Sequence, residues 1–215
     1  MSNTKPKKRD RKATEQAIVE AFSRVVERDG LAAAHPTSVM AEAGYSKPLL
    51  YDYFGDMRGL VQAWFDQNQI WPDYDFPDTI TSDDELKQCL KKFLLSIAQS
   101  LRENSIALEF LAAEVTHSFE YKDILEKSRK KWMQKNLAAV MSHPDIQQDD
   151  NMRLLFVVYN AICYLALRSR LSARQVGLQL NEDHDWAEAM TRVENVIDDL
   201  IQIHQFRRQM KNEPK

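Results

Sequence analysis

Glycine and proline are scarce in this sequence, with 5 and 7 copies among 215 residues. Both disfavour helix interiors, and the chain is otherwise rich in Ala, Leu, Glu, Gln, Lys and Arg, so we expect an all-helical protein. The two cysteines, Cys89 and Cys163, are too few and too far apart for a disulfide framework or a metal site of clustered ligands. We expect Cys163, which lies in an apolar run, to be a small core residue.

Long apolar runs are also absent. The N-terminus has no apolar segment, so we expect no secretory signal. The longest apolar stretch, residues 154–167, contains Asn160 and is shorter than the roughly 20 residues that span a bilayer. No nucleophile elbow, phosphate-binding glycine loop or metal-protease motif occurs. We therefore expect a cytoplasmic protein that is not an enzyme and has no membrane partner, no cofactor and no metal.

Charge is distributed unevenly along the chain. The net charge is −3, yet residues 1–12 hold six basic side chains against one acid. Because binding of nucleic acid depends on the local field, mild overall acidity does not exclude it. We predict that residues 1–10 form a flexible basic arm that follows phosphates or enters the minor groove. The alternative is a solvated tail that only aids solubility.

The most informative stretch runs from residue 34 to residue 60. Pro36 suits the first turn of a helix, and Gly44 suits the left-handed residue that ends one. Ser46 can then cap a second helix, which carries Lys47 in its first turn and Leu50 on its inner face. Two short helices joined by a glycine-containing turn of about 3–4 residues form a helix-turn-helix. The second helix would then enter a groove of DNA.

The same stretch resembles the N-terminal domain of the TetR family of bacterial transcription regulators. The resemblance covers about residues 10–70 and is carried by the run AEAGYSKPLLYDYFGDMRGL. It implies an all-α fold, in which a three-helix DNA-binding domain precedes a larger helical domain for ligand binding and dimerisation. His35 stands where the family usually caps its second helix with Thr or Ser. Met57 stands where many members have a phosphate-contacting lysine, so we assign that role to Arg58.

We expect seven residues of this stretch to contact DNA. Lys47 can reach a phosphate or a guanine edge, and Leu49 can meet thymine methyl groups. The resemblance implies that Tyr51 hydrogen-bonds a backbone phosphate. The alternative is a helical hairpin packed inside the protein. The full set is Thr37, Tyr45, Ser46, Lys47, Leu49, Tyr51 and Arg58.

The proline-bearing, aromatic and acidic segment WPDYDFPDTITS, residues 71–82, marks a domain boundary. We predict a DNA-binding domain over residues 11–70, which includes the start of a linking helix, and a regulatory and dimerisation domain over 71–215. The stretch from 149 to 171 is apolar nearly all round, which predicts a helix buried on both sides. Further helices are expected at about 83–103, from about 106 to 117, at 121–141 and at 185–210. The basic side of the 121–141 helix should face solvent, with a second DNA surface as the alternative.

A regulatory pocket would be mostly apolar with a few polar groups. The candidates for it are Trp64, Trp71, Phe110, Glu114, His117, Trp132, Tyr159, Asn160 and Cys163, although an aromatic residue taken singly belongs to the core more often than to a pocket. An amide inside an apolar helix costs free energy unless it is hydrogen-bonded. Asn160 therefore bonds a ligand, a neighbouring backbone group or its symmetry mate. Glu114 and His117 stand three apart, as metal ligands can, but without a Cys/His cluster we expect an ordinary surface pair.

The last helix carries so wide an apolar face that it needs partners on two sides. One is its own domain, and the other is plausibly the same pair of helices from a second copy, related by a two-fold axis. The resemblance implies the same arrangement, because the family dimerises through its last two long helices. The expected interface residues are Leu155, Tyr159, Ile162, Trp186, Met190, Val193, Ile197, Leu200 and Ile201.

These observations favour a homodimeric transcription regulator that binds a palindromic DNA operator and responds to an unknown small-molecule effector. Repression is the usual output of the family, so a repressor released by an inducer is expected. The alternative from another class is a protein-interaction adaptor on the same scaffold.

Overall fold

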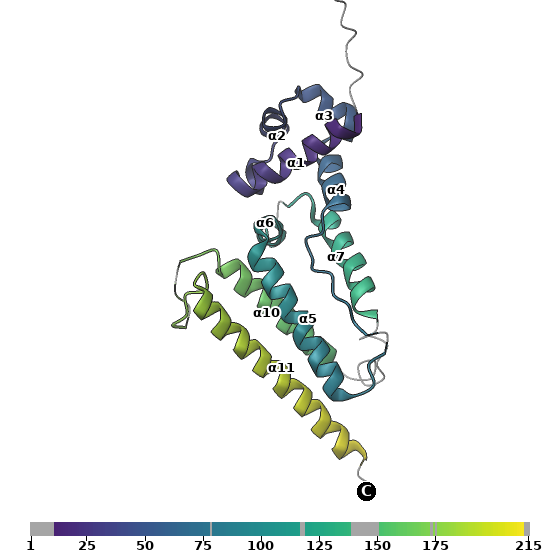
Figure 1. The fold of residues 1–215 in the computed structure, drawn as a ribbon, viewed down its shortest axis with the longest axis vertical. Coiled ribbons are helices and arrows are strands. Elements are labelled where there is room, and N and C mark those ends of the chain that lie inside the picture. Colours follow the sequence, from purple (N-terminus) through teal and green to yellow (C-terminus); the bar gives the residue numbers. More distant parts are fainter. Residues whose placement is uncertain are drawn as a thin grey trace, which may run out of the picture. The chain divides into compact units, whose positions relative to one another are not determined.

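The computed structural model describes residues 11–77, 79–116, 119–138, 151–172, 174 and 176–212. The elements within these ranges are helices, which confirms the predicted all-α class (Figure 1). In chain order they are α1 (Arg11–Asp29), the 3-10 helix η1 (Leu31–Ala33), α2 (Pro36–Ala43), α3 (Lys47–Phe54), α4 (Met57–Gln67), α5 (Asp83–Glu103), α6 (Ser105–Glu114), α7 (Lys122–Asn136), α10 (Asn151–Arg168) and α11 (Asp183–Asn212).

Residue contacts divide the chain into two compact units. The first unit comprises Met1–Gln69 and Ala113–Leu125, and the second comprises Ile70–Ala112 and Glu126–Lys215. The sequence predicts one continuous second domain, whereas the segment Ala113–Leu125 groups with the first unit. The predicted basic arm, residues 1–10, lies outside the described residues. Within the described residues, no helix combines the length and the apolarity that crossing a bilayer requires.

Helix α1 supplies the core of the first unit. Its side chains Ile18, Phe22 and Val25 have no exposed surface, and their spacing of three or four residues places them on one face as predicted. This face packs against α2 and α4. Trp64 of α4 donates from its indole nitrogen to the hydroxyl of Ser23 at 2.7 Å, which satisfies a polar group that the packing buries.

A left-handed glycine joins α2 to α3. Gly44 has φ 73° and ψ 26°, and the next amide, that of Tyr45, donates to the carbonyl of Met40 at 3.0 Å. This is the turn that the sequence predicts, because only glycine takes up this conformation without strain. At the other end of α2, the hydroxyl of Ser38 accepts from the backbone amide of His35 at 3.0 Å. Ser38 therefore helps to close a helix start at which histidine is an unusual cap.

A second glycine, Gly59, allows α4 to start directly after α3. A Cβ atom at Gly59 would lie 1.8 Å from the carbonyl oxygen of Phe54. The backbone amide of Gly59 also donates to the carboxylate of Asp56 at 2.7 Å, which caps α4. Any side chain at this position would collide with backbone, which cannot rotate away as a flexible side chain can.

We predict that Gly59→Ala destabilises the first unit, even though alanine is the better helix former. The backbone clash should lower the free energy of unfolding by about 1–3 kcal/mol, as overpacking does. Urea denaturation followed by circular dichroism measures the change. Gln62→Ala on the same helix is the matched control and should be close to neutral. A Gly59→Ala protein as stable as the wild type would show that α3 and α4 can separate without cost.

In the second unit, α5, α10 and α11 pack against one another. Ile162 of α10 and Trp186 and Ile197 of α11 are buried in this unit. Two ion pairs add to the contact between α5 and α11, because Asp198 lies 3.0 Å from the ammonium of Lys87 and 3.1 Å from that of Lys91.

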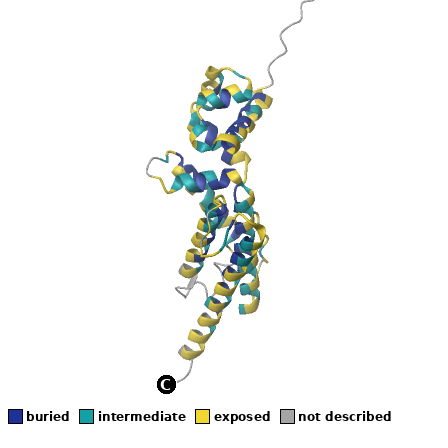
Figure 2. Ribbon diagram, turned by 90° about the vertical axis from the view of Figure 1, so that its left-hand side faces the viewer, coloured by how far each residue is buried: buried dark blue, intermediate teal, exposed yellow. Residues whose placement is uncertain are grey.

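Helix α10 differs from its prediction. The sequence predicts burial on both sides, but Phe156, Val157 and Tyr164 are 58%, 61% and 53% exposed in the single chain. Helix α10 packs on both α5 and α11, and these three apolar side chains nevertheless remain more than half exposed. Figure 2 likewise shows exposed residues along α11, the helix that runs to the marked C-terminus. The apolar pattern of a sequence predicts how much of a helix surface is buried. It does not show whether that surface is buried by the same chain or by a partner.

Two predicted helices are shorter than expected. α6 ends at Glu114 and α7 at Asn136, whereas the sequence predicts ends near residues 117 and 141. His117 and residues 139–150 lie outside the described residues.

Candidate nucleic-acid interface and ligand site

The turn and α3 present most of the predicted DNA-contacting side chains to solvent. Leu50 is fully buried against the first unit, which fixes the rotation of α3. With Leu50 inward, Ser46 and Lys47 are exposed and Tyr51 is 47% exposed. Thr37 near the start of α2 is exposed as well.

Three of the predicted contacts differ in detail. Tyr45 and Leu49 are half-buried, so Leu49 offers only part of its side chain to a base. Ser46 occupies the N-cap position of α3, but its hydroxyl forms no capping hydrogen bond, which corrects the capping role that we expected. The hydroxyl of Ser46 is exposed instead.

Arg58 differs most from its prediction. Its guanidinium pairs with the carboxylate of Asp123 and donates to the carbonyl oxygen of Glu120 at 2.7 Å. Both partners belong to the first unit, in the segment that returns to it from later in the chain. The predicted phosphate contact would have to displace these bonds. The sequence did not indicate the Arg58–Asp123 pair, because these two residues are 65 positions apart.

Other cations of the first unit are also paired. The carboxylate of Glu42 lies 2.8 Å from both Arg24 and Arg28, and these guanidinium groups hold its pKa below the usual value. The guanidinium of Arg11 stacks over the ring of Tyr53 at 4.7 Å. Lys47 has no carboxylate partner among the described residues, so its charge is fully available to a phosphate.

The Arg58–Asp123 pair predicts a pH-dependent contact. Hydrogen bonding from Arg58 lowers the pKa of Asp123 below its ordinary value. A carboxyl with a depressed pKa stabilises the folded state at pH values above its unfolded pKa, and this contribution disappears as the pH falls through the folded pKa. We predict that Arg58→Gln raises the titration midpoint of Asp123, measured by carboxyl carbon NMR shifts. Arg24→Gln, which breaks a similar pair elsewhere, should leave that midpoint unchanged, and a midpoint insensitive to Arg58 would contradict the pairing.

The predicted ligand residues do not form one cluster. Trp64 is buried in the first unit and hydrogen-bonded to Ser23, which corrects its assignment to a pocket of the second domain. Phe110 on α6 is fully buried, and Glu114 is the last residue of the same helix. His117 cannot be placed, so its proposed pairing with Glu114 stays a prediction.

Three further candidates lie on α10. Tyr159 and Cys163 are half-buried, and the ring of Tyr159 stacks on that of Phe156 with centroids 6.2 Å apart. Asn160 is exposed and donates from its amide nitrogen to the carbonyl of Phe156 at 2.7 Å. Of the three readings of Asn160, a bond to neighbouring backbone is the one observed.

Trp71 and Trp132 do come together, in an aromatic cluster that joins the linker (residues 71–82) to α5 and α7. Their ring centroids are 5.7 Å apart, and Phe93 of α5 stacks on Trp132 at 5.3 Å. Tyr74 and Phe76 of the linker lie on Phe93 at 5.5 Å and 5.1 Å. Burial raises the pKa of the Tyr74 phenol, which therefore stays neutral at physiological pH.

Side chains of α7 hold the backbone of the linker. Trp132 donates from its indole nitrogen to the carbonyl of Pro72 at 2.7 Å, and Asn136 accepts from the amide of Tyr74 at 3.1 Å. The ammonium of Lys135 lies 2.7 Å from the carboxylate of Asp73. Sequence reasoning treated this segment only as a domain boundary, although its alternation of aromatic and acidic residues was a signal that it packs on something.

One donor in the aromatic cluster is not satisfied. Trp71 is 2% exposed, and its indole N–H has no hydrogen-bond acceptor within the described part of the chain. A buried donor without an acceptor costs about 1–3 kcal/mol. The guanidinium of Arg129 lies 5.4 Å from the centre of the same ring.

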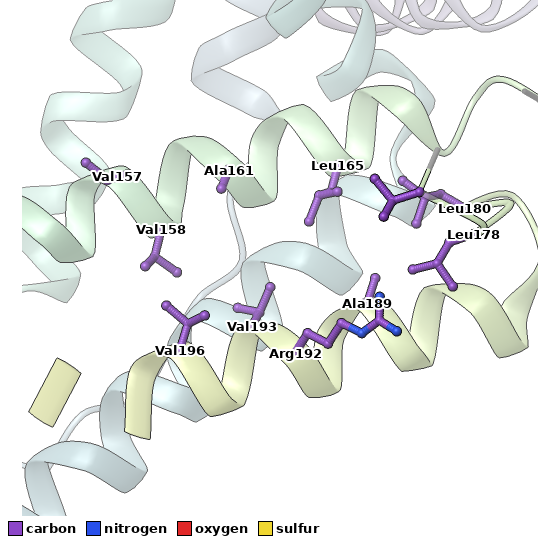
Figure 3. Close-up of a pocket in the computed structure, with 11 residues that line it drawn as sticks. Val157, Val158, Ala161, Leu165, Leu178, Leu180, Ala189, Arg192, Val193 and Val196 are labelled. Atoms are coloured by element: carbon purple, nitrogen blue, oxygen red, sulfur yellow. The ribbon is translucent and has the colours of Figure 1, made fainter. Parts of the chain in front are cut away.

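A separate apolar groove of about 410 Å³ lies between α10 and α11 (Figure 3). Val158, Ala161 and Leu165 of α10 face Ala189, Val193 and Val196 of α11 across it. Its charged lining residue, Arg192, pairs with Glu188. None of the predicted ligand residues lines this groove.

The predicted dimer-interface residues need correction. Ile162, Trp186, Met190, Val193, Ile197 and Ile201 are each at most 9% exposed, because they pack within their own chain. Leu155, Tyr159 and Leu200 are half-buried. The apolar side chains that remain exposed are different ones, and on α11 they include Val196 and Ile203.

His184, Asp185 and Glu188 gather at the start of α11, with ligand-capable atoms within 4.8 Å of one another. All three are already engaged, and the imidazole of His184 lies 3.3 Å from the carboxylate of Asp185. Asp185 accepts from the amide of Gln179 at 2.7 Å, which lowers its pKa, and Glu188 pairs with Arg192. We assign no metal site to this cluster.

The sequence matches no family model, and no curated protein matches it. The structure is similar to the crystal structure of a TetR transcriptional regulator from Agrobacterium tumefaciens, with a TM-score of 0.64 and 18% identity over 89% of this chain and 94% of that chain. It also matches the crystal structure of a HlyIIR mutant with an alanine-substituted segment, with a TM-score of 0.44 and 11% identity over 94% of this chain and 97% of that chain.

Proposed function

We propose that this chain, which has the fold of TetR-type transcriptional regulators, is a homodimeric DNA-binding regulator that represses transcription until a small molecule binds. The observation that carries the proposal is the orientation of α3. Leu50 is fully buried while its neighbours Lys47 and Tyr51 are exposed, so the helix offers a cation and a phenol on its outer side. Lysine and tyrosine are common partners of phosphate and base edges in protein–DNA complexes.

Exposed apolar side chains support a dimer. Phe156, Val157 and Tyr164 on α10, together with Val196 and Ile203 on α11, are between 44% and 61% exposed in the single chain. Apolar surface gathered on two adjacent helices is characteristic of an interaction site. A two-fold dimer would bury the same face of both copies, and its two α3 helices would then read a palindromic operator at half-sites about one helical turn, or a small multiple of it, apart.

An effector would act through the spacing of the two DNA-binding units. A ligand that binds better to the state with mis-spaced units must weaken DNA binding, and by linkage DNA must weaken ligand binding to the same extent. The TetR resemblance favours repression as the output.

One observation favours a second candidate, the protein-interaction adaptor. Arg24, Arg28 and Arg58 of the first unit are engaged by carboxylates, which leaves a weaker positive field than most DNA-binding surfaces have. An adaptor would use the same exposed α3 to contact a protein.

We predict that the purified protein enriches a palindromic sequence from a random duplex library, with affinity that falls as salt rises. Lys47→Ala should weaken binding to the selected site about tenfold or more. In a dimer it should also reduce the slope of log affinity against log salt by about 2, because two phosphate contacts are lost. Tyr51→Phe should weaken binding without changing this slope.

Lys92→Ala is the matched control, because Lys92 is an exposed lysine on α5 of the second unit. It should leave both affinity and slope unchanged. If no palindrome is enriched, and a protein co-purifies with the chain in a fixed ratio that Lys47→Ala abolishes, the adaptor replaces the regulator.

We predict that Val157→Glu converts the dimer to a monomer, because two buried carboxylates would face each other near the two-fold axis. Sedimentation velocity measures the mass. Val115→Glu, at a valine that is 82% exposed in the first unit, provides the same substitution away from the proposed interface and should remain dimeric. A dimeric Val157→Glu protein would show that this face of α10 lies outside the interface.

A further inference from the structure

We propose that the aromatic cluster of the second unit is a binding site for a planar aromatic carboxylic acid, and that linker residues 73–76 occupy this site as an internal substitute for the ligand. We call these four residues the strap. The permanent part of the site consists of Phe93 on α5 with Trp132 and Lys135 on α7. The regulatory consequence of this inference rests on the proposed function, but the binding itself does not.

The strap presents a carboxylate and an aromatic ring on successive residues, Asp73 and Tyr74. The ring of Tyr74 lies 5.5 Å from that of Phe93, and Phe93 stacks in turn on Trp132. The carboxylate of the adjacent Asp73 lies 2.7 Å from the ammonium of Lys135. An aromatic acid would offer the same two groups, with its ring in the place of Tyr74 and its carboxylate in the place of Asp73.

The charges around Trp132 favour an anion over a neutral ligand. Arg129 and Lys135 each lie three residues from Trp132 on α7, one turn before it and one turn after it, so the aromatic floor has a cation on both sides. The guanidinium of Arg129 already stacks over Trp71 at 5.4 Å.

The closed cluster also contains a buried donor that nothing satisfies. The indole N–H of Trp71 is enclosed at the edge of the cluster and has no acceptor among the described residues. Buried polar groups are normally paired, so an unsatisfied one at this position points to an acceptor that the strap does not provide. A hydroxyl or carbonyl substituent on the ring of the ligand would supply one.

The strap is weakly attached to the rest of the unit. It has no regular secondary structure, and Tyr74 and Phe76 are only half-buried. Its contacts include the backbone hydrogen bond from Tyr74 to Asn136, the ring contacts with Phe93 and an ion pair whose two side chains are 67% and 62% exposed. Exposed pairs contribute little, so opening this segment should cost far less than unfolding the unit.

The position of the strap in the sequence gives the binding event a consequence. The strap lies shortly after the point where the chain first passes from the first unit to the second, between Gln69 and Ile70. A ligand that displaces the strap loosens the chain on the second unit's side of this boundary. If the chain is a regulator as proposed, release of the linker is how the ligand changes DNA binding.

The test is isothermal titration calorimetry of the full chain with 1-naphthoate, with 1-naphthylmethanol as the neutral probe. We expect naphthoate to bind with one site per chain and more tightly than the alcohol. Lys135→Met should lower the affinity for naphthoate relative to that for the alcohol about twofold to fivefold, as expected for an exposed ion pair, because losing the Asp73 pair loosens the strap equally for both probes. The matched control is Lys131→Met, one turn earlier on α7, which should change neither.

Substitutions in the strap should tighten naphthoate binding, whereas the substitution of Lys135 weakens it relative to the alcohol. Tyr74→Ala removes the competing ring and should tighten naphthoate binding about threefold to tenfold, the strength of an aromatic pair. Asp73→Asn removes the competing carboxylate at an exposed position, where folding is safe, and should tighten it about twofold to fivefold. A site in which these residues were walls rather than competitors would lose affinity in both variants.

Three results would each overturn the proposal. The first is that neither the wild type nor Asp73→Asn binds naphthoate at millimolar concentration. The second is that the wild type binds the acid and the alcohol with equal affinity. The third is that Asp73→Asn binds naphthoate more weakly than the wild type does. The titration contains no DNA, so a failure to enrich an operator leaves its outcome unaffected. Naphthoate binding that leaves affinity for a selected operator unchanged would retain the site and remove its regulatory role.

Discussion

The apolar face of α1 is the contact on which the orientation of α3 depends. Phe22 and its neighbours in the stripe have no exposed surface, and α2 and α4 both pack on this helix. Helix α3 is placed between them by Gly44 on one side and by Gly59 on the other. Burial of Leu50 then fixes the rotation of α3 about its own axis. The exposure of Lys47 and Tyr51 is thus a consequence of packing on the opposite side of the unit.

Charge has two different uses in this chain. In the first unit it fastens segments to one another, since Glu42 holds Arg24 and Arg28, and Asp123 holds Arg58. Each pair removes a cation from the field available to DNA. In the second unit the basic residues of α7 meet an acidic, aromatic linker, and the Lys135–Asp73 pair is one result. The same composition that reads as a solvated helix face in the sequence is therefore partly an attachment site for the linker.

Some apolar side chains of the second unit are buried within the chain, and others remain exposed in the single chain. Trp186, Met190 and Ile197 of α11 are buried in their own unit, whereas Val196 and Ile203, like Phe156 and Val157 of α10, remain exposed in the single chain. Neighbouring stripes on one helix differ by only about 100° of rotation. The wide apolar face of α11 predicts that all of it is buried, either within the chain or against a partner. The packing of α5 decides which side of this face is buried within the chain and which side is left for a partner.

The sequence by itself determined the local structure: the helices, the left-handed turn at Gly44, the inward Leu50 and the outward Lys47. These follow from hydrogen bonds and side-chain periodicity within a few residues. Only the tertiary structure decided where Arg58 and Trp64 find their partners, which apolar stripe of α11 is free, and that the linker packs into an aromatic cluster with α5 and α7. Those contacts join residues some 40 to 110 positions apart, and no local pattern encodes which of several chemically equivalent partners the folded chain brings within reach.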